Sequence, residues 1–225
     1  MGTVTLQCVI LILSAVQVFS IQTLYMDDAC VSSTVTYIDT AAKIKASRYR
    51  TPRNNLNCSL VVRARPMDQL VAVVRDMSSS CKYTMVTAYD GENRNRKIQD
   101  MCGSSEYSLP RRSFTSSQNA MVFTLSTSSV STSCTYDIIV TSYSTGSCSF
   151  GFECNNGRCI DSSLSCNGYN NCGDNSDETL CSNAVVLGAG IIVAIVLGGC
   201  FVVICLPIII VVSILRRRRA YYARF

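Results

Sequence analysis

Hydrophobic residues fall into three patterns along the chain. Two are long stretches of mostly apolar residues without a charge, Cys8–Phe19 and Ala184–Leu215. Between them, residues 30–143 hold short runs of β-branched and aromatic residues, separated by clusters of Pro, Gly, Asn and Ser, and no run has a helical period. Such runs predict β-strands, and this spacing is typical of a β-sandwich. The runs are Leu60–Val62, Leu70–Val74, Tyr83–Tyr89, Ala120–Leu125 and Tyr136–Val140.

The first apolar stretch, Cys8–Phe19, is too short to span a bilayer comfortably. A short apolar segment followed by small residues such as Ser20 is typical of a secretory signal peptide, although Met1–Gln7 contains no Lys or Arg. We therefore predict a signal peptide over residues 1–20.

The second stretch, Ala184–Leu215, has 32 residues without a charge and is followed at once by Arg216–Arg219. A straight helix of that length would measure about 48 Å against a hydrocarbon core of about 30 Å, so it must tilt, kink at Pro207 or leave residues in the interface. Arginines after a membrane helix mark its cytoplasmic end. The pattern predicts a transmembrane helix region over 184–215, a cytoplasmic tail over 216–225, and residues 21–183 outside. The expected location is the plasma membrane, as a single-pass type I protein with an extracellular N-terminus.

Composition agrees with this orientation and argues against catalysis. Of the 14 cysteines, 11 lie on the predicted outer side, where disulfides form. The chain has no histidine, so it lacks the commonest general base and zinc ligand, and we expect no enzyme activity. Residues 30–143 carry 14 basic and 8 acidic side chains, net +6, whereas residues 148–181 carry 1 and 5, net −4.

Six cysteines crowd into 34 residues, at positions 148, 154, 159, 166, 172 and 181. A segment this short cannot bury enough apolar surface to fold without disulfides, a metal or both. Its carboxylates gather beside Cys172 and Cys181, and oxygen ligands favour calcium over zinc.

The ending Cys172-Gly-Asp-Asn-Ser-Asp-Glu178 makes this segment resemble the LDL-receptor class A repeat. The resemblance implies the disulfides Cys148–Cys159, Cys154–Cys172 and Cys166–Cys181. It also implies a calcium cage of four side chains and two backbone carbonyls, with Asp174 as a buried supporting acid. The cage positions are the carbonyls of Leu164 and Tyr169 and the side chains of Asn167, Asn171, Asp177 and Glu178.

Two of these positions depart from the family pattern. Asn167 and Asn171 stand where the family has carboxylates, so the cage keeps oxygen atoms but loses two negative charges, and calcium affinity should fall. The alternative is a domain held by disulfides alone. The family often binds a partner's lysine through the cage acids and an aromatic residue; Leu164 stands at the aromatic position, which weakens that mode and favours a spacer role.

Residues 30–143 resemble a CUB domain. The resemblance rests on the cysteine pairs Cys30/Cys58 and Cys81/Cys102, on Tyr89-Asp-Gly91 and on Met101-Cys-Gly103, although the usual tryptophan is absent. It implies an all-β, jelly-roll-like sandwich. Many CUB domains hold calcium on three acids; here Asp76 matches the first, Thr84 replaces the second, and residues 107–136 contain no acid for the third. We expect no calcium site in this domain.

Three further features of the outer part remain open. A basic cluster, Arg94-Asn-Arg96-Lys97 with Arg111-Arg112, either faces solvent or binds an acidic partner such as heparan sulfate. Cys134 has no partner in the expected scheme and could link two chains, pair atypically or stay a buried thiol. Asn57-Cys-Ser59 is a glycosylation sequon whose middle residue is an expected disulfide cysteine.

The membrane segment and tail carry two short motifs. Gly190, Ala194 and Gly198 follow a small-xxx-small spacing that permits helix self-association. Tyr222-Ala-Arg-Phe225 matches a tyrosine-based sorting signal.

Together these features predict a type I binding or adhesion protein, co-receptor or auxiliary subunit whose ectodomain binds an extracellular protein, with no nucleic-acid partner. The alternative is an endocytic scavenger-type receptor that uses Tyr222 and Phe225. The expected fold is an all-β CUB-like sandwich, then a small disulfide-rich calcium-type domain, then one transmembrane α-helix.

Overall fold

The computed structural model describes residues 21–30, 35–104, 111–130, 132–179, 181 and 213–215. The described residues up to Glu178 form one compact unit, and residues from Thr179 onward belong to a second. The predicted signal peptide 1–20, the tail 216–225 with Tyr222 and Phe225, and Gly190, Ala194 and Gly198 lie outside the described residues, as does all of segment 184–215 except Ser213–Leu215. Within the described residues, no helix has the length and apolar character needed to cross a membrane.

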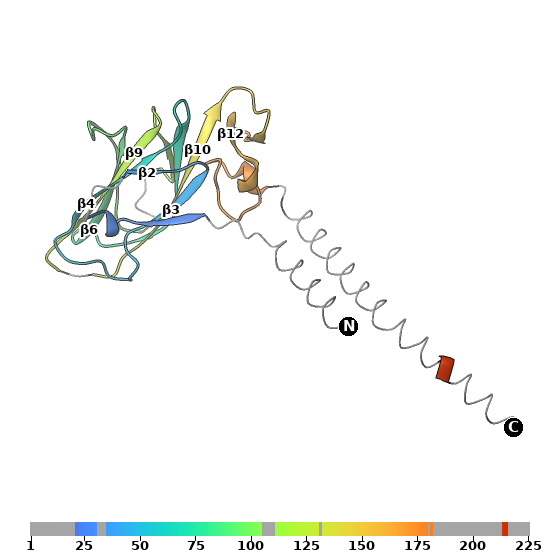
Figure 1. Ribbon diagram of the computed structural model, residues 1–225. Helices are drawn as coiled ribbons and strands as arrows, with labels where there is room; N and C mark the ends of the chain where they lie inside the picture. Colours follow the sequence, from blue (N-terminus) through green and yellow to red (C-terminus); the bar gives the residue numbers. More distant parts are fainter. Residues whose placement is uncertain are drawn as a thin grey trace. The chain divides into compact units, whose positions relative to one another are not determined.

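Two β-sheets make up most of the first unit (Figure 1). One runs in the order β1 (Gln22–Tyr25), β3 (Ala41–Lys45), β10 (Thr135–Thr145), β5 (Gln69–Ser78) and β8 (Ser113–Thr115). The other runs β2 (Val35–Tyr37), β4 (Asn57–Arg63), β9 (Ala120–Thr127), β6 (Thr84–Asp90) and β7 (Arg96–Met101). The pairs β1–β3 and β2–β4 are parallel, and the other pairs within these sheets are antiparallel.

The main core lies between the two sheets. In β4 the alternate residues Cys58, Leu60 and Val62 are buried, as expected of a strand that covers a core with one face. They share one apolar cluster with Ile44 of β3 and Ile138 of β10. The expected two-layer sandwich is therefore confirmed, and the five hydrophobic runs correspond to β4, β5, β6, β9 and β10.

The cysteine-rich module, residues 148–181, contains little regular structure. It has two short strands, β11 (Gly151–Glu153) and β12 (Arg158–Asp161), and two 3₁₀ turns, η2 (Ser162–Leu164) and η3 (Ser176–Glu178); a third turn, η1 (Asp28–Cys30), precedes β2. The structure joins Cys30 to Cys58, Cys81 to Cys102, Cys148 to Cys159 and Cys154 to Cys172. Cys166 and Cys181 are each disulfide-bonded as well.

Cys134 is a free, buried cysteine. Only 5% of its surface is exposed, although the stretch before it, including Ser129 and Val130, is exposed. Burial raises the pKa of its thiol to about 11. Of the three alternatives for this residue, the structure shows the buried thiol. The sequon residue Asn57 is exposed at the start of β4, while Cys58 points inward.

Candidate functional site

The cysteine-rich module continues the first sheet of the sandwich. Ser144 and Thr145, at the end of β10, pair with Cys159 and Arg158 of β12, and β12 pairs in turn with β11. Figure 1 shows β12 beside the end of β10. Because backbone hydrogen bonds run from β10 into this hairpin, the module is attached to the sandwich by a shared sheet and not only by a linker.

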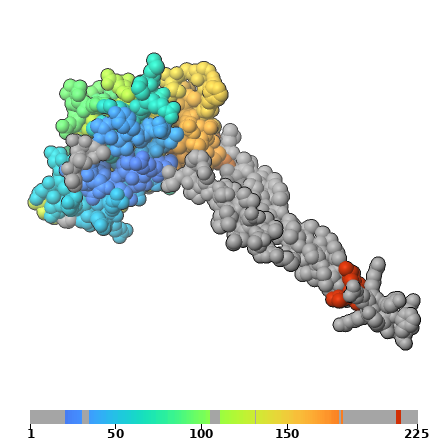
Figure 2. Space-filling view, in the orientation of Figure 1, coloured from blue at the N-terminus to red at the C-terminus, as the bar shows by residue number. Residues whose placement is uncertain are grey.

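A second apolar cluster lies on the outer face of that sheet. Val71 and Val73 of β5, Ala41 of β3 and Tyr143 of β10 pack against Ile160, Leu164, Cys154 and Cys172 of the module. Figure 2 shows the module, in yellow and orange, adjoining the body of the sandwich. The outer face of β5 is therefore covered by the module, and the two parts share a buried interface. The spacer role stays a prediction.

Gly173 permits the closest approach between the two parts. Its φ is +86°, and a Cβ there would lie 2.6 Å from the Arg158 Nη1, 2.7 Å from the Ser113 Oγ and 3.0 Å from a Val71 methyl. Only glycine fits this left-handed backbone against β5 and β8 without moving a neighbour.

Cationic side chains also bridge the interface. Arg158 donates to the Cys172 carbonyl at 2.6 Å and lies 5.1 Å from the centre of the Tyr143 ring. Lys43 of β3 donates to the Tyr169 hydroxyl at 2.9 Å, with its Nζ 4.4 Å from the ring centre. The Lys43 hydrogen bond lowers the pKa of the Tyr169 phenol. These contacts join the basic sandwich to the acidic module.

The lysine contact differs from the one that the resemblance implies. Leu164, at the expected aromatic position, is 4% exposed and belongs to the second apolar cluster, so it cannot contact a partner. Tyr169 instead contacts Lys43 and lies 5.0 Å from the guanidinium of Arg75, both from the same chain.

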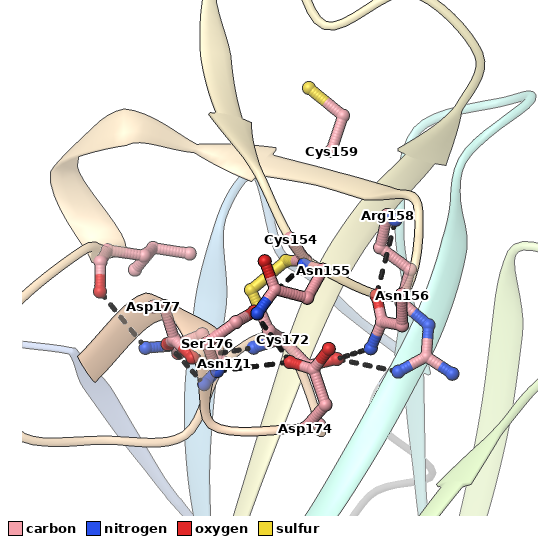
Figure 3. Close-up of a disulfide and its surroundings, with 12 residues drawn as sticks. Cys154, Asn155, Asn156, Arg158, Cys159, Asn171, Cys172, Asp174, Ser176 and Asp177 are labelled. Atoms are coloured by element: carbon pink, nitrogen blue, oxygen red, sulfur yellow. Dashed lines mark hydrogen bonds between the residues drawn. A yellow bond between two sulfur atoms is a disulfide. The ribbon is translucent and has the colours of Figure 1, made fainter. Parts of the chain in front are cut away.

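Asn171 lies at the centre of the expected calcium cage. Its side-chain Nδ2, which carries two hydrogens, lies within hydrogen-bonding distance of three acceptors: the Leu164 carbonyl at 3.2 Å, the Asn167 Oδ1 at 2.9 Å and the Tyr169 carbonyl at 2.9 Å. All three acceptors are positions of the expected ligand set. Figure 3 shows Asn171 and Asp177 beside the Cys154–Cys172 disulfide.

The two carboxylates of the expected cage accept backbone hydrogen bonds. Asp177, 1% exposed, accepts from the Asn171 N–H at 2.7 Å and from the Cys172 N–H at 3.3 Å. Glu178 accepts from the N–H groups of Asn167 at 2.8 Å and Gly168 at 3.1 Å.

Asp174 does not match the buried supporting acid that the resemblance implies. It is exposed, and its Oδ1 accepts from the Ser176 N–H at 3.1 Å and from the Ser176 hydroxyl at 2.7 Å. Asp174 precedes the turn η3 and accepts hydrogen bonds from Ser176, the first residue of that turn, so it stabilises the start of η3 from an exposed position.

As they lie, these residues do not fit a calcium ion. A cation needs oxygen atoms around it, whereas the Asn171 amide places a hydrogen-bond donor among them. No group of three or more His, Cys, Asp or Glu in the described part of the chain is placed to hold a metal. In the sandwich, Asp76 is exposed on β5 and Thr84 is buried at the start of β6.

The basic cluster is partly assembled. Arg96, Lys97 and Arg111 line one open hollow, together with Arg158 from the cysteine-rich module. Two of these charges are paired, Arg96 with Asp90 at 3.2 Å and Lys97 with Asp100 at 2.8 Å. Arg94 instead donates to Ser59. The heparan-sulfate interpretation stays a prediction.

A second hollow lies at the junction of the two parts. The sandwich lines it with Asp39, Arg65 and Asp68, and the cysteine-rich module with Phe150 and Asp161. Phe150 is 98% exposed, so its large apolar ring is in contact with solvent. We call this surface the junction groove.

Sequence reasoning missed the residues that join the two parts, chiefly Thr141, Tyr143, Arg158 and Gly173. One signal was present: Leu70–Val74 is apolar without alternation, and an uninterrupted apolar strand is buried on both faces. That signal indicates that some other part of the chain covers the outer face of this strand, but it does not show which part.

Comparison with known proteins gives two domain matches. The CUB domain model matches residues 30–143, which is about half of the chain, and the low-density lipoprotein receptor domain class A model matches residues 146–181. Both are typically non-enzymatic modules that bind proteins outside cells. Both also typically bind calcium.

Curated relatives match short parts of the chain. Complement component C6 of Bos taurus is 62% identical over 34 residues, 15% of this chain and 4% of that protein. Low-density lipoprotein receptor-related protein 11 of Mus musculus is 48% identical over 46 residues, 18% of this chain and 10% of that protein. The chain thus spans only a small part of these relatives.

Solved structures match about half of the chain. The CUB1-EGF-CUB2 domain of human MASP-1/3 has a TM-score of 0.41 at 8% identity, covering 49% of this chain and 42% of that one. The MASP-1 CUB2 domain bound to Ca²⁺ has a TM-score of 0.40 at 10% identity, covering 48% of this chain and 97% of that one.

Proposed function

Since this chain belongs to the CUB domain family and carries a class A domain directly after its CUB domain, we propose that it is a single-pass cell-surface protein whose ectodomain binds another extracellular protein. Adhesion molecule, co-receptor and auxiliary subunit all fit this description. The scavenger-receptor alternative rests on Tyr222 and Phe225, which lie outside the described residues, and it stays a hypothesis.

One observation carries the proposal: two protein-binding domain types are packed into one unit and share the junction groove. Exposed aromatic rings in a partly enclosed site are typical anchors of protein interfaces. Phe150 has that position, at the edge where the sandwich and the module meet.

The charges of the groove indicate the chemistry of the partner. Three acids, Asp39, Asp68 and Asp161, and one guanidinium, that of Arg65, line the groove. Arg65 forms an ion pair with Asp39 at 3.4 Å. Hydrogen bonds from Ser163 lower the pKa of the Asp161 carboxyl. We therefore propose a partner segment that presents basic side chains around an apolar one.

The test uses the full chain on the surface of intact cells, with an epitope tag after residue 20. Staining of the tag without permeabilisation is expected, since the N-terminus is proposed to be extracellular; staining only after permeabilisation contradicts the topology. The same cells are then screened against a panel of secreted proteins and receptor ectodomains.

For any partner found, Phe150→Ala is expected to weaken binding by at least about tenfold, because the ring is the proposed anchor. Tyr49→Ala is the matched control, since Tyr49 is 76% exposed but lies outside the groove, and it should change binding less than about threefold. Binding that is unaffected by Phe150→Ala but lost on Arg111→Glu would place the site in the hollow lined by Arg96, Lys97 and Arg111, and would overturn the groove proposal.

A further inference from the structure

The Asn171 amide has a defined orientation because each end has its own partner. Its Oδ1 accepts from the Thr141 hydroxyl at 3.1 Å, and its Nδ2 faces three oxygen atoms. Thr141 is 1% exposed on β10, and Asn171 is fully buried. Turning the amide over would set its oxygen against three other oxygens with no hydrogen between them, which is costly in a buried site.

The amide therefore does locally what a cation does in a metal cage. It brings Leu164, Asn167 and Tyr169 to one point, and these residues span the loop between η2 and Cys172. Unlike a cation, it also reaches out of the module, because Thr141 belongs to the sandwich.

The carboxylates of the cage are also satisfied without a metal. Asp177 and Glu178 each accept two backbone N–H groups. These N–H groups satisfy the oxygen atoms of the buried Asp177 side chain, so its burial does not require a cation beside it.

We propose that the Asn171 side chain takes the place of calcium in this class A domain. The loop from Leu164 to Glu178 is closed by hydrogen bonds, and the domain folds and docks on β10 without a bound metal. This inference is independent of the proposed partner.

The test is hydrogen exchange by mass spectrometry on the full chain in detergent micelles, followed over peptides that cover residues 164–178. The wild-type chain should show the same protection in EGTA and in millimolar CaCl₂, within about twofold, because no closing bond involves the metal. A loss of protection in EGTA, or stoichiometric calcium binding in a calorimetric titration, overturns the proposal.

Two matched variants separate the amide from the number of charges. Asn171→Asp removes the donor and adds a carboxylate, so exchange in EGTA should rise by about tenfold or more, and calcium should restore protection. Asn167→Asp adds the same charge but keeps the oxygen that accepts from Tyr169 and Asn171, so its loop should stay protected in EGTA. Equal behaviour of the two variants would mean that charge alone governs the loop, which contradicts the proposal.

If the Asn171→Asp variant does not accumulate in cells, Thr141→Val tests the same amide from the sandwich side. It keeps the shape of the side chain but removes the hydroxyl that orients the amide. Protection of residues 164–178 in EGTA should fall, by about threefold to tenfold. Unchanged protection would show that the amide is not held from β10 and would overturn the docking half of the proposal.

Discussion

At the residue scale, Cys134 shows how burial decides chemistry. The sequence leaves an odd cysteine in the outer part of the chain, which is compatible with a link between two chains. The structure buries it, and desolvation of the thiolate raises its pKa from 9.0 to about 11. Since the thiolate is the reactive form, a folded chain presents Cys134 as an inert thiol.

We expect alkylation of Cys134 by iodoacetamide at pH 8 to be at least about 100-fold slower in the folded chain than in the unfolded one. The rate should increase with pH up to about 11, and the Cys134 contribution to stability should fall as pH rises from 9 through 11, because only the unfolded state ionises readily there. Peptide mapping by mass spectrometry distinguishes Cys134 from Cys200 and Cys205. Rapid labelling, or an interchain disulfide at Cys134, would contradict this assignment.

Asn171 marks the limit of sequence reasoning at this scale. Alignment to the class A pattern identifies Asn167 and Asn171 as departures from the family's carboxylates. It does not reveal that the Asn171 amide turns its nitrogen inward, because that orientation depends on Thr141, 30 residues earlier in the chain. The residue types at the cage positions could be predicted from the sequence. The orientation of the Asn171 amide could not, because it depends on neighbours that only the folded structure brings together.

At the element scale, β5 connects the fold to the site. Leu70, Ala72 and Val74 enter the main core, and Val71 and Val73 enter the second cluster, so five consecutive residues are buried. The run predicted the strand correctly. The partner of its outer face could not be predicted, because the module that covers it lies in another part of the sequence and has too few apolar residues to show a pattern.

Gly173 tests this packing. Gly173→Ala should lower the free energy of unfolding by about 2–4 kcal/mol, through left-handed backbone strain together with overpacking against β5 and β8. Gly157→Ala is the matched control, since Gly157 also has a positive φ, +78°, but has no atom within 4 Å of its would-be Cβ. The control should cost only the backbone strain, about 1–2 kcal/mol. Urea unfolding followed by circular dichroism measures both, and equal costs would refute the close approach.

At the scale of the whole molecule, the two parts differ in net charge and are joined by a shared sheet, an apolar cluster and cation–π contacts. The sandwich segment 30–143 has a net charge of +6 and the module segment 148–181 one of −4. Lys43 and Arg75 of the sandwich contact Tyr169, and the hairpin β11–β12 extends the sheet from β10. The sequence showed two modules of opposite net charge, and the structure shows the contacts that join them.

This union is the central claim, and hydrogen exchange with increasing temperature tests it most directly. In the full chain, amides of β5 and of β12 should lose protection at the same midpoint, within about 3 °C, because their elements share one apolar cluster and one sheet. If β12 opens about 10 °C or more below β5, the module is an independent domain, and the account of a single binding unit is contradicted.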